Sequence, residues 1–116
     1  MRTTIARTVI AAAALLGGAT HALATEMLLE ERLARAEEAR IIASPIAGIQ
    51  NHLWFDYLGD VVEAQEELVS DLNRASDLED LRDAWEEYTH ELRHEREHYV
   101  DEMAERGYRS FTITVD

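Results

Sequence analysis

Three of the chain's five histidines, His90, His94 and His98, recur at every fourth residue with glutamates between them. Four residues make about one turn of an α-helix, so these imidazoles would line one side of a helix. Imidazole is the commonest side-chain ligand of transition metals, and an i, i+4 pair can chelate Zn²⁺, Ni²⁺ or Cu²⁺. The predicted ligands are these histidines and the carboxylates that could complete the coordination shell: His90, His94, His98, Glu87, Glu97 and Asp101.

Two catalytic interpretations of this segment are disfavoured. The peptidase interpretation lacks a strand before the motif and a chain large enough for a cleft, and the di-iron interpretation conflicts with the direction of the side chains. His90-Glu91-Leu92-Arg93-His94 resembles the H-E-x-x-H motif of the zincin peptidases, which also need a sheet, a third ligand from beyond the motif helix and a cleft. The E-x-x-H steps resemble those of ferritin-like di-iron bundles, whose ligands point inward. At about 100° per residue, His90 and His94 lie about 160° from Leu92, the centre of the helix's apolar side, and His98 lies about 120° from it. We therefore expect a non-enzymatic protein with no organic cofactor and an outward-facing metal site.

Like charges on the same helix add an electrostatic argument. Five acidic residues follow one another at i, i+4, and each such pair costs about 0.2–0.5 kcal/mol: Glu79, Asp83, Glu87, Glu91 and Glu95. A bound cation, high salt or a basic partner would relieve this repulsion. Two alternatives need no metal. The face could be an ordinary solvated surface, or its imidazoles could take up protons, and so positive charge, in an acidic exterior.

The composition narrows the classes of partner. The 116 residues include 24 acidic and 11 basic side chains, all of the latter arginine, for a formal net charge of −13. Such a surface disfavours nucleic acid and favours cations or a basic or membrane-associated protein partner. Because the chain has no cysteine, it cannot form a disulfide, a thiolate metal site or a c-type haem attachment.

The first 24 residues have the pattern of a secretory signal peptide. Arg2 and Arg7 precede a short apolar run, and Ala22-Leu23-Ala24 forms an A-x-A cleavage site. We expect cleavage there, a periplasmic or extracellular location and no transmembrane span in the mature protein. An uncleaved anchor is the alternative.

The remaining pattern predicts an all-α fold, with a helical domain over residues 25–106 made of helices at about 26–43, 45–74 and 77–106. Ser44-Pro45 is a helix start signal, although a kinked continuation of the first helix is possible. Ser76 to Glu79 reads as a capping box, and Gly107 ends the last helix. We expect a long antiparallel helical hairpin with a shorter N-terminal helix, and we expect this three-helix arrangement to dimerise. In outline this is similar to small periplasmic helical-hairpin proteins that sense metals or act as chaperones, although the L-T-x-x-Q repeats of the chaperones are absent.

Apolar periodicity indicates where the helices pack. The last helix carries a heptad seam: Leu78, Leu81, Trp85, Tyr88, Leu92, Tyr99 and Met103. Antiparallel pairing is expected to set Trp85 near Ala64 and Leu92 near Tyr57 or Leu58. The middle helix has a second apolar stripe, formed by Phe55, Leu58, Val62 and Val69, that needs another neighbour, which would be the first helix, a second protomer or both. In the tail, residues 107–116, Phe111, Ile113 and Val115 alternate as in a strand. The rival hypothesis is therefore an interaction, assembly or chaperone-like module that uses this stripe and the tail without metal.

Overall fold

The computed structural model describes residues 26–109, which form three α-helices and one short turn. Helix α2 spans Leu29–Glu38, the 3₁₀ turn η1 spans Ile46–Gly48, α3 spans His52–Arg74 and α4 spans Leu78–Glu105. No strand occurs within residues 26–109, so the expected all-helical fold is confirmed for that part of the chain. The expected signal segment and the three alternating apolar residues of the tail lie outside the described residues.

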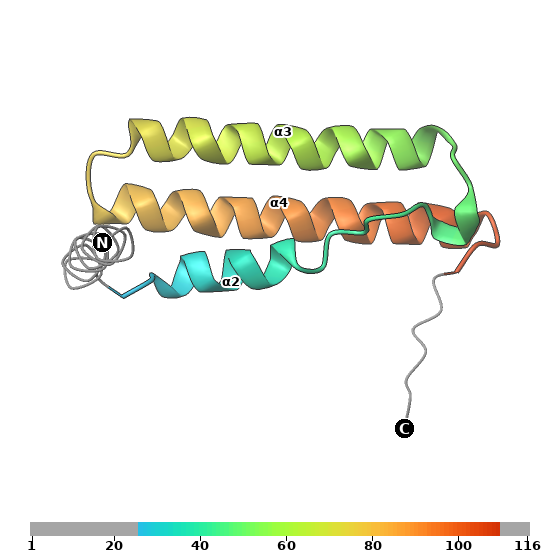
Figure 1. Cartoon of the computed structure of the whole chain (residues 1–116), viewed down its shortest axis with the longest axis horizontal. Coiled ribbons are helices and arrows are strands. Elements are labelled where there is room, and N and C mark those ends of the chain that lie inside the picture. The colour runs from blue at the N-terminus through green and yellow to red at the C-terminus, as the bar shows by residue number, and fades with distance from the viewer. Residues whose placement is uncertain (1–25, 110–116) are drawn as a thin grey trace, which may run out of the picture.

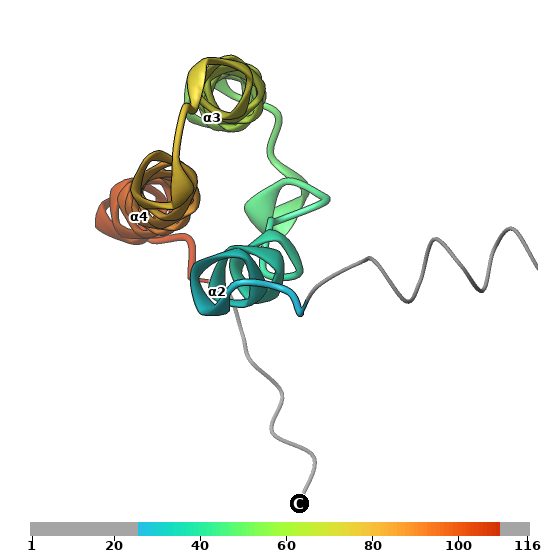
Figure 2. The ribbon, with the colours of Figure 1, turned by 90° about the vertical axis from the view of Figure 1, so that its left-hand side faces the viewer.

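Helix α4 is the central element of the domain. It packs against both α3 and α2. Figure 2 shows these two helices on different sides of α4. The chain turns back after α3, and α3 and α4 lie side by side (Figure 1). The connection from α2 to α3 runs along the C-terminal half of α4. The predicted close packing of the two long helices is confirmed.

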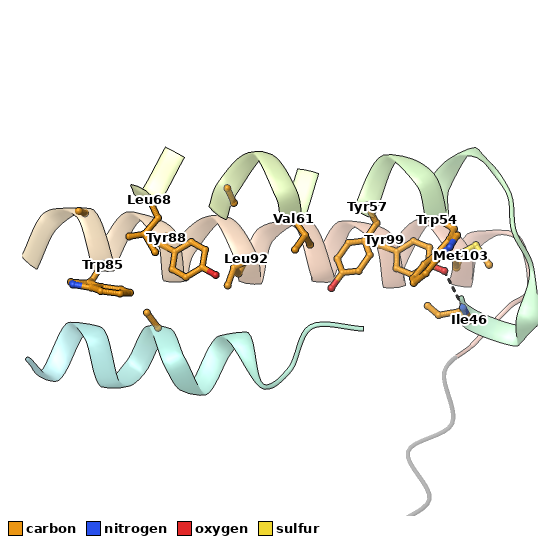
Figure 3. Packing of buried hydrophobic residues seen from close by; sticks show 13 residues of the cluster. Ile46, Trp54, Tyr57, Val61, Leu68, Trp85, Tyr88, Leu92, Tyr99 and Met103 are labelled. Carbon is orange, nitrogen blue, oxygen red and sulfur yellow. Dashed lines mark hydrogen bonds between the residues drawn. The ribbon is translucent and has the colours of Figure 1, made fainter. Parts of the chain in front are cut away.

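The core is a single row of side chains between the helices (Figure 3). Its aromatic part is a stack of Tyr57 on Tyr99, with ring centroids 4.9 Å apart and planes 12° from parallel. Trp54 lies 5.8 Å from the same Tyr99 ring. The predicted seam of α4 is buried at Trp85, Tyr88, Leu92, Tyr99 and Met103, whereas its first residue, Leu78, is 57% exposed. Burial of these large rings is the main source of stability in so small a domain.

The connection between α2 and α3 corrects two predicted helix boundaries. Helix α2 ends at Glu38 rather than near residue 43, and α3 begins at His52 rather than at Pro45. The start signal at Ser44-Pro45 leads only to the turn η1, because Ala47 and Gly48 adopt positive φ angles of 56° and 71° that end the turn. Helix α3 is capped instead by the Asn51 side chain, which accepts a hydrogen bond from the Trp54 N–H.

Two tyrosine hydroxyls explain why this connection stays non-helical. The Tyr57 hydroxyl accepts the Ile42 N–H at 2.9 Å, and the Tyr99 hydroxyl accepts the Ile46 N–H at 3.0 Å (Figure 3 draws the second). These bonds satisfy backbone donors that would otherwise be buried without a partner. Burial is also the main cause of the raised pKa of Tyr57. The two hydrogen bonds therefore hold the connection, residues 39–51, against the core. We call this connection the strap.

The N-cap of α4 and the alignment of the two long helices also differ from the predicted ones. Asp77, not Ser76, is the N-cap of α4, and its side chain accepts the Asp80 N–H at 2.8 Å. Asp80 in turn accepts the Ser76 N–H and hydroxyl, and these two bonds hold the pKa of Asp80 below its usual range. The alignment of α3 on α4 also differs from the expected one, since Tyr57 stacks on Tyr99, seven residues beyond Leu92. Ala64, expected near Trp85, lines a groove with Glu91 and Glu95.

Candidate functional site

The three histidines of α4 form a ladder on the solvent side of the helix. His90 and His94 have ring centroids 6.4 Å apart and planes 18° from parallel, and His94 and His98 repeat this at 6.4 Å and 14°. All three side chains are exposed. The inward positions of the same helix hold the buried seam, which explains the outward direction of the imidazoles.

The carboxylates predicted as partners lie on the same helix but not in one preformed group with the histidines. Glu87, Glu97 and Asp101 are exposed, as are the imidazoles. Within the described residues, the three-residue cluster whose potential ligand atoms all lie within 4.8 Å of one another consists of Glu67, Glu87 and Glu91. Of the six predicted ligands, only Glu87 belongs to it. The histidine ladder thus provides pairs of imidazole ligands. Of the three clustered carboxylates, Glu67 belongs to α3 and the other two to α4.

An acidic groove follows the contact between α3 and α4. It is lined by Ala64 and five carboxylate side chains: Asp60, Glu63, Glu67, Glu91 and Glu95. Burial, followed by the charge of Glu67 and a hydrogen bond with it, raises the pKa of Glu91 to about 7. Burial and the adjacent Asp60 raise the pKa of Glu95, which His94 and His98 partly offset. Carboxylates therefore face one another across this interface with little compensating positive charge.

His98 joins the ladder to this groove. It lines a neighbouring depression together with Asp56 and Asp60 of α3 and Glu95 of α4. The ladder therefore runs from His90, which lines a depression with Glu30 and Leu33 of α2, to His98 at the edge of the α3–α4 interface. A cation bound near His98 would also face carboxylates of α3.

The second apolar stripe of α3 is exposed, because the first of the predicted helices, α2, packs on α4 and does not cover the stripe. Its four residues are Phe55, Leu58, Val62 and Val69, with exposed fractions of 56%, 37%, 51% and 58%. We call this set the α3 surface. Neither α2 nor α4 covers it, because α4 contacts the opposite side of α3 through Tyr57, Val61 and Leu68. Exposed apolar side chains gathered on one helix face are typical of a protein contact.

One charged site was not foreseen in the sequence. Glu37 of α2 is only 3% exposed and lies against three arginines, with Arg96 of α4 its nearest ionic partner. Arg93 and Arg40 lie 3.6 and 3.9 Å from its other carboxylate oxygen. In a chain with 24 acidic residues, no sequence signal distinguishes this glutamate from the others. The ionic contacts of Glu37 hold α2 against α4.

Further contacts hold α2 against α4. Tyr88 donates its hydroxyl proton to Glu38 at 2.7 Å, and burial with this bond raises the pKa of Tyr88 to about 12. Arg35 lies over the Trp85 ring at 4.9 Å. Arg82 pairs with Glu30 at 2.8 Å.

None of the helices in the described part of the chain is long and apolar enough to cross a bilayer.

A comparison with protein-family models, with curated proteins and with solved structures finds no match to this chain.

Proposed function

We propose that this protein is a non-enzymatic, exported metal-binding protein that holds a divalent transition-metal ion on the histidine ladder of α4. The observation that carries the proposal is the ladder itself, three exposed imidazoles one turn apart on a single 28-residue helix. Zn²⁺, Ni²⁺ and Cu²⁺ are the ions that such nitrogen ligands prefer.

Binding would require the rings of one pair to turn toward each other. Metal–nitrogen bonds of about 2.0–2.1 Å in a tetrahedral shell bring the two nitrogens to about 3.3 Å from each other. The rings, whose centroids are 6.4 Å apart, have room for this rotation because all three side chains are exposed. Glu87 can complete a site at His90 and His94, whereas Glu97 or Asp101 can complete one at His94 and His98. Water or a second protomer would fill the remaining positions.

The charge of the surroundings supports a cation as the ligand. The ladder borders the acidic groove, and the chain as a whole carries a formal net charge of −13. A bound divalent ion lowers the repulsion along α4 and across the α3–α4 contact. In this proposal the antiparallel hairpin of α3 and α4 displays the ladder, and the ion is sensed, buffered or used to bridge two protomers in the periplasm or outside the cell.

Calorimetric titration of the mature protein with Zn²⁺, Ni²⁺ and Cu²⁺ tests the proposal. We expect a dissociation constant tighter than about 10 μM, a binding free energy of about 7 kcal/mol, and loss of this binding in the His90→Ala/His94→Ala double variant. The matched control is His52→Ala, which removes an exposed histidine at the start of α3. Weaker binding, or equal binding by the double variant, contradicts the proposal.

A second candidate function is favoured by the α3 surface. An exposed apolar stripe on an otherwise charged domain supports an interaction or assembly module, with a homodimer or a basic or membrane-associated protein as partner. Phe111, Ile113 and Val115 of the tail belong to this hypothesis. If Phe55→Asp leaves both the oligomeric state and the co-purifying proteins unchanged, the second candidate fails.

A further inference from the structure

The α3 surface has a spacing that is symmetric about its central residue. Phe55 precedes Val62 by seven residues and Val69 follows it by seven, so the three side chains lie two helical turns apart on one face. An antiparallel copy of the same helix, related by a two-fold axis at Val62, would set each Phe55 against the other copy's Val69. A face that matches itself after a two-fold rotation is what an isologous dimer contact requires.

Gly59 provides an independent observation at the same place. It lies inside α3, one turn before Val62 is reached, where glycine is less favourable than alanine. A Cβ atom added at Gly59 would meet nothing within 4 Å, so packing inside the chain does not require glycine. A second helix approaching the α3 surface would require it, because the missing side chain lets two backbones come close.

The charges of α3 are arranged so that two acidic copies can meet at this surface. The carboxylates Asp60, Glu63 and Glu67 line the acidic groove on the side toward α4. Beside the α3 surface lie Gln65 and Gly59, which carry no charge, and a single acid, Glu66. In the antiparallel arrangement the two Glu66 side chains are about 12 Å apart along the axis, beyond the Debye length of about 8 Å at physiological salt. Each faces Leu58 of the other copy instead.

We propose that the occupant of the α3 surface is a second copy of this chain, whose α3 packs antiparallel across a two-fold axis at Val62. This rests on the second candidate function above and names its partner. The contact extends about 21 Å along one helix of each protomer, from Phe55 to Val69. A contact between single helices is expected to bury less than the about 800 Å² per partner of a standard interface. The dimer is therefore concentration-dependent. Added salt strengthens it, because salt screens the repulsion between two acidic protomers.

Sedimentation velocity over a range of concentrations measures the association. The wild-type protein is expected to dimerise, Val62→Glu to weaken the dimer at least tenfold, and Ser70→Glu, which adds the same charge about 100° round the helix from Val69, to leave it intact. Because both positions are exposed, circular dichroism should show equal helix content in the two variants. A wild-type protein that stays monomeric up to about 1 mM, or a dimer that Val62→Glu does not weaken, overturns the proposal.

Cysteine cross-linking tests the register, since the chain contains no cysteine of its own. A short bis-maleimide should join two Val62→Cys protomers, whereas two Ser70→Cys protomers, about 24 Å apart along the axis, should remain separate. Cross-linking of both variants to the same extent refutes the antiparallel register. If the protein is monomeric yet Phe55→Asp still removes a co-purifying protein, self-association fails while the interaction function stands.

Discussion

Replacing Glu91 by glutamine should stabilise the fold at neutral and alkaline pH. Glu91 faces Glu67, Glu87 and Asp71 in and beside the acidic groove, and its pKa rises from 4.5 to about 7 because of burial first and these charges second. A raised pKa means that the ionised carboxylate is less favourable in the folded protein than in the unfolded chain. The charged form of Glu91 therefore opposes folding.

The sign and size of the pH dependence follow from this difference. Below pH 4.5 Glu91 is protonated in both states and has no effect. Between pH 4.5 and about 7 the folded state holds more protons, so the free energy of unfolding falls as pH rises. The pKa difference corresponds to an upper limit of about 3.4 kcal/mol. Because the side chain is partly exposed and screened by solvent, we expect about 1–2 kcal/mol.

Urea denaturation at pH 5 and pH 8 in the presence of a chelator measures this effect. Glu91→Gln should be more stable than the wild type by about 1–2 kcal/mol at pH 8, with the gain shrinking toward pH 5. Glu97→Gln is the matched control, because it removes the same charge from an exposed position of α4 outside the groove. Equal gains at both pH values, or an equal gain in the control, would refute the reasoning.

Three other substitutions test the packing. Glu37→Gln should destabilise the fold by about 2–3 kcal/mol because it leaves the half-buried Arg96 without its carboxylate, and a loss below about 0.5 kcal/mol in urea denaturation would be inconsistent with this. Tyr99→Phe should cost about 1–2 kcal/mol by leaving the Ile46 N–H without an acceptor, with faster hydrogen exchange at that amide as its signature. Gly59→Ala should stabilise the dilute monomer by about 0.5–1 kcal/mol yet weaken self-association, and tighter association would argue against close helix contact.

Helical periodicity predicted most of the fold because it depends on local sequence. The apolar seam of α4 and the second apolar stripe of α3 follow from side-chain spacing alone, and the outward direction of the histidines follows from their angle to Leu92. That the stripe of α3 is left exposed depends on where α2 packs, which spacing does not predict. The strap could not be predicted in this way. Its path depends on hydroxyl groups of Tyr57 and Tyr99, which are distant in sequence from the backbone donors that they satisfy.

The alignment of α3 on α4 and the ionic contacts could not be predicted from the sequence either, because they too join residues that are distant in the chain. A heptad pattern allows several alignments of two long helices, and the stack of Tyr57 on Tyr99 selects one of them. The apposition of Glu67 with Glu91 follows from that alignment. In a chain with 24 acidic residues, only the packed structure distinguishes these two and the buried Glu37 from the others.

Nuclear magnetic resonance of the histidine side chains during Zn²⁺ titration tests metal binding most directly, because it reports on each imidazole separately. We predict that the ring nitrogens of His90, His94 and His98 shift together and saturate at one equivalent, while those of His52 stay unchanged. No saturable shift in the ladder, or an equal shift at His52, would contradict the proposed function.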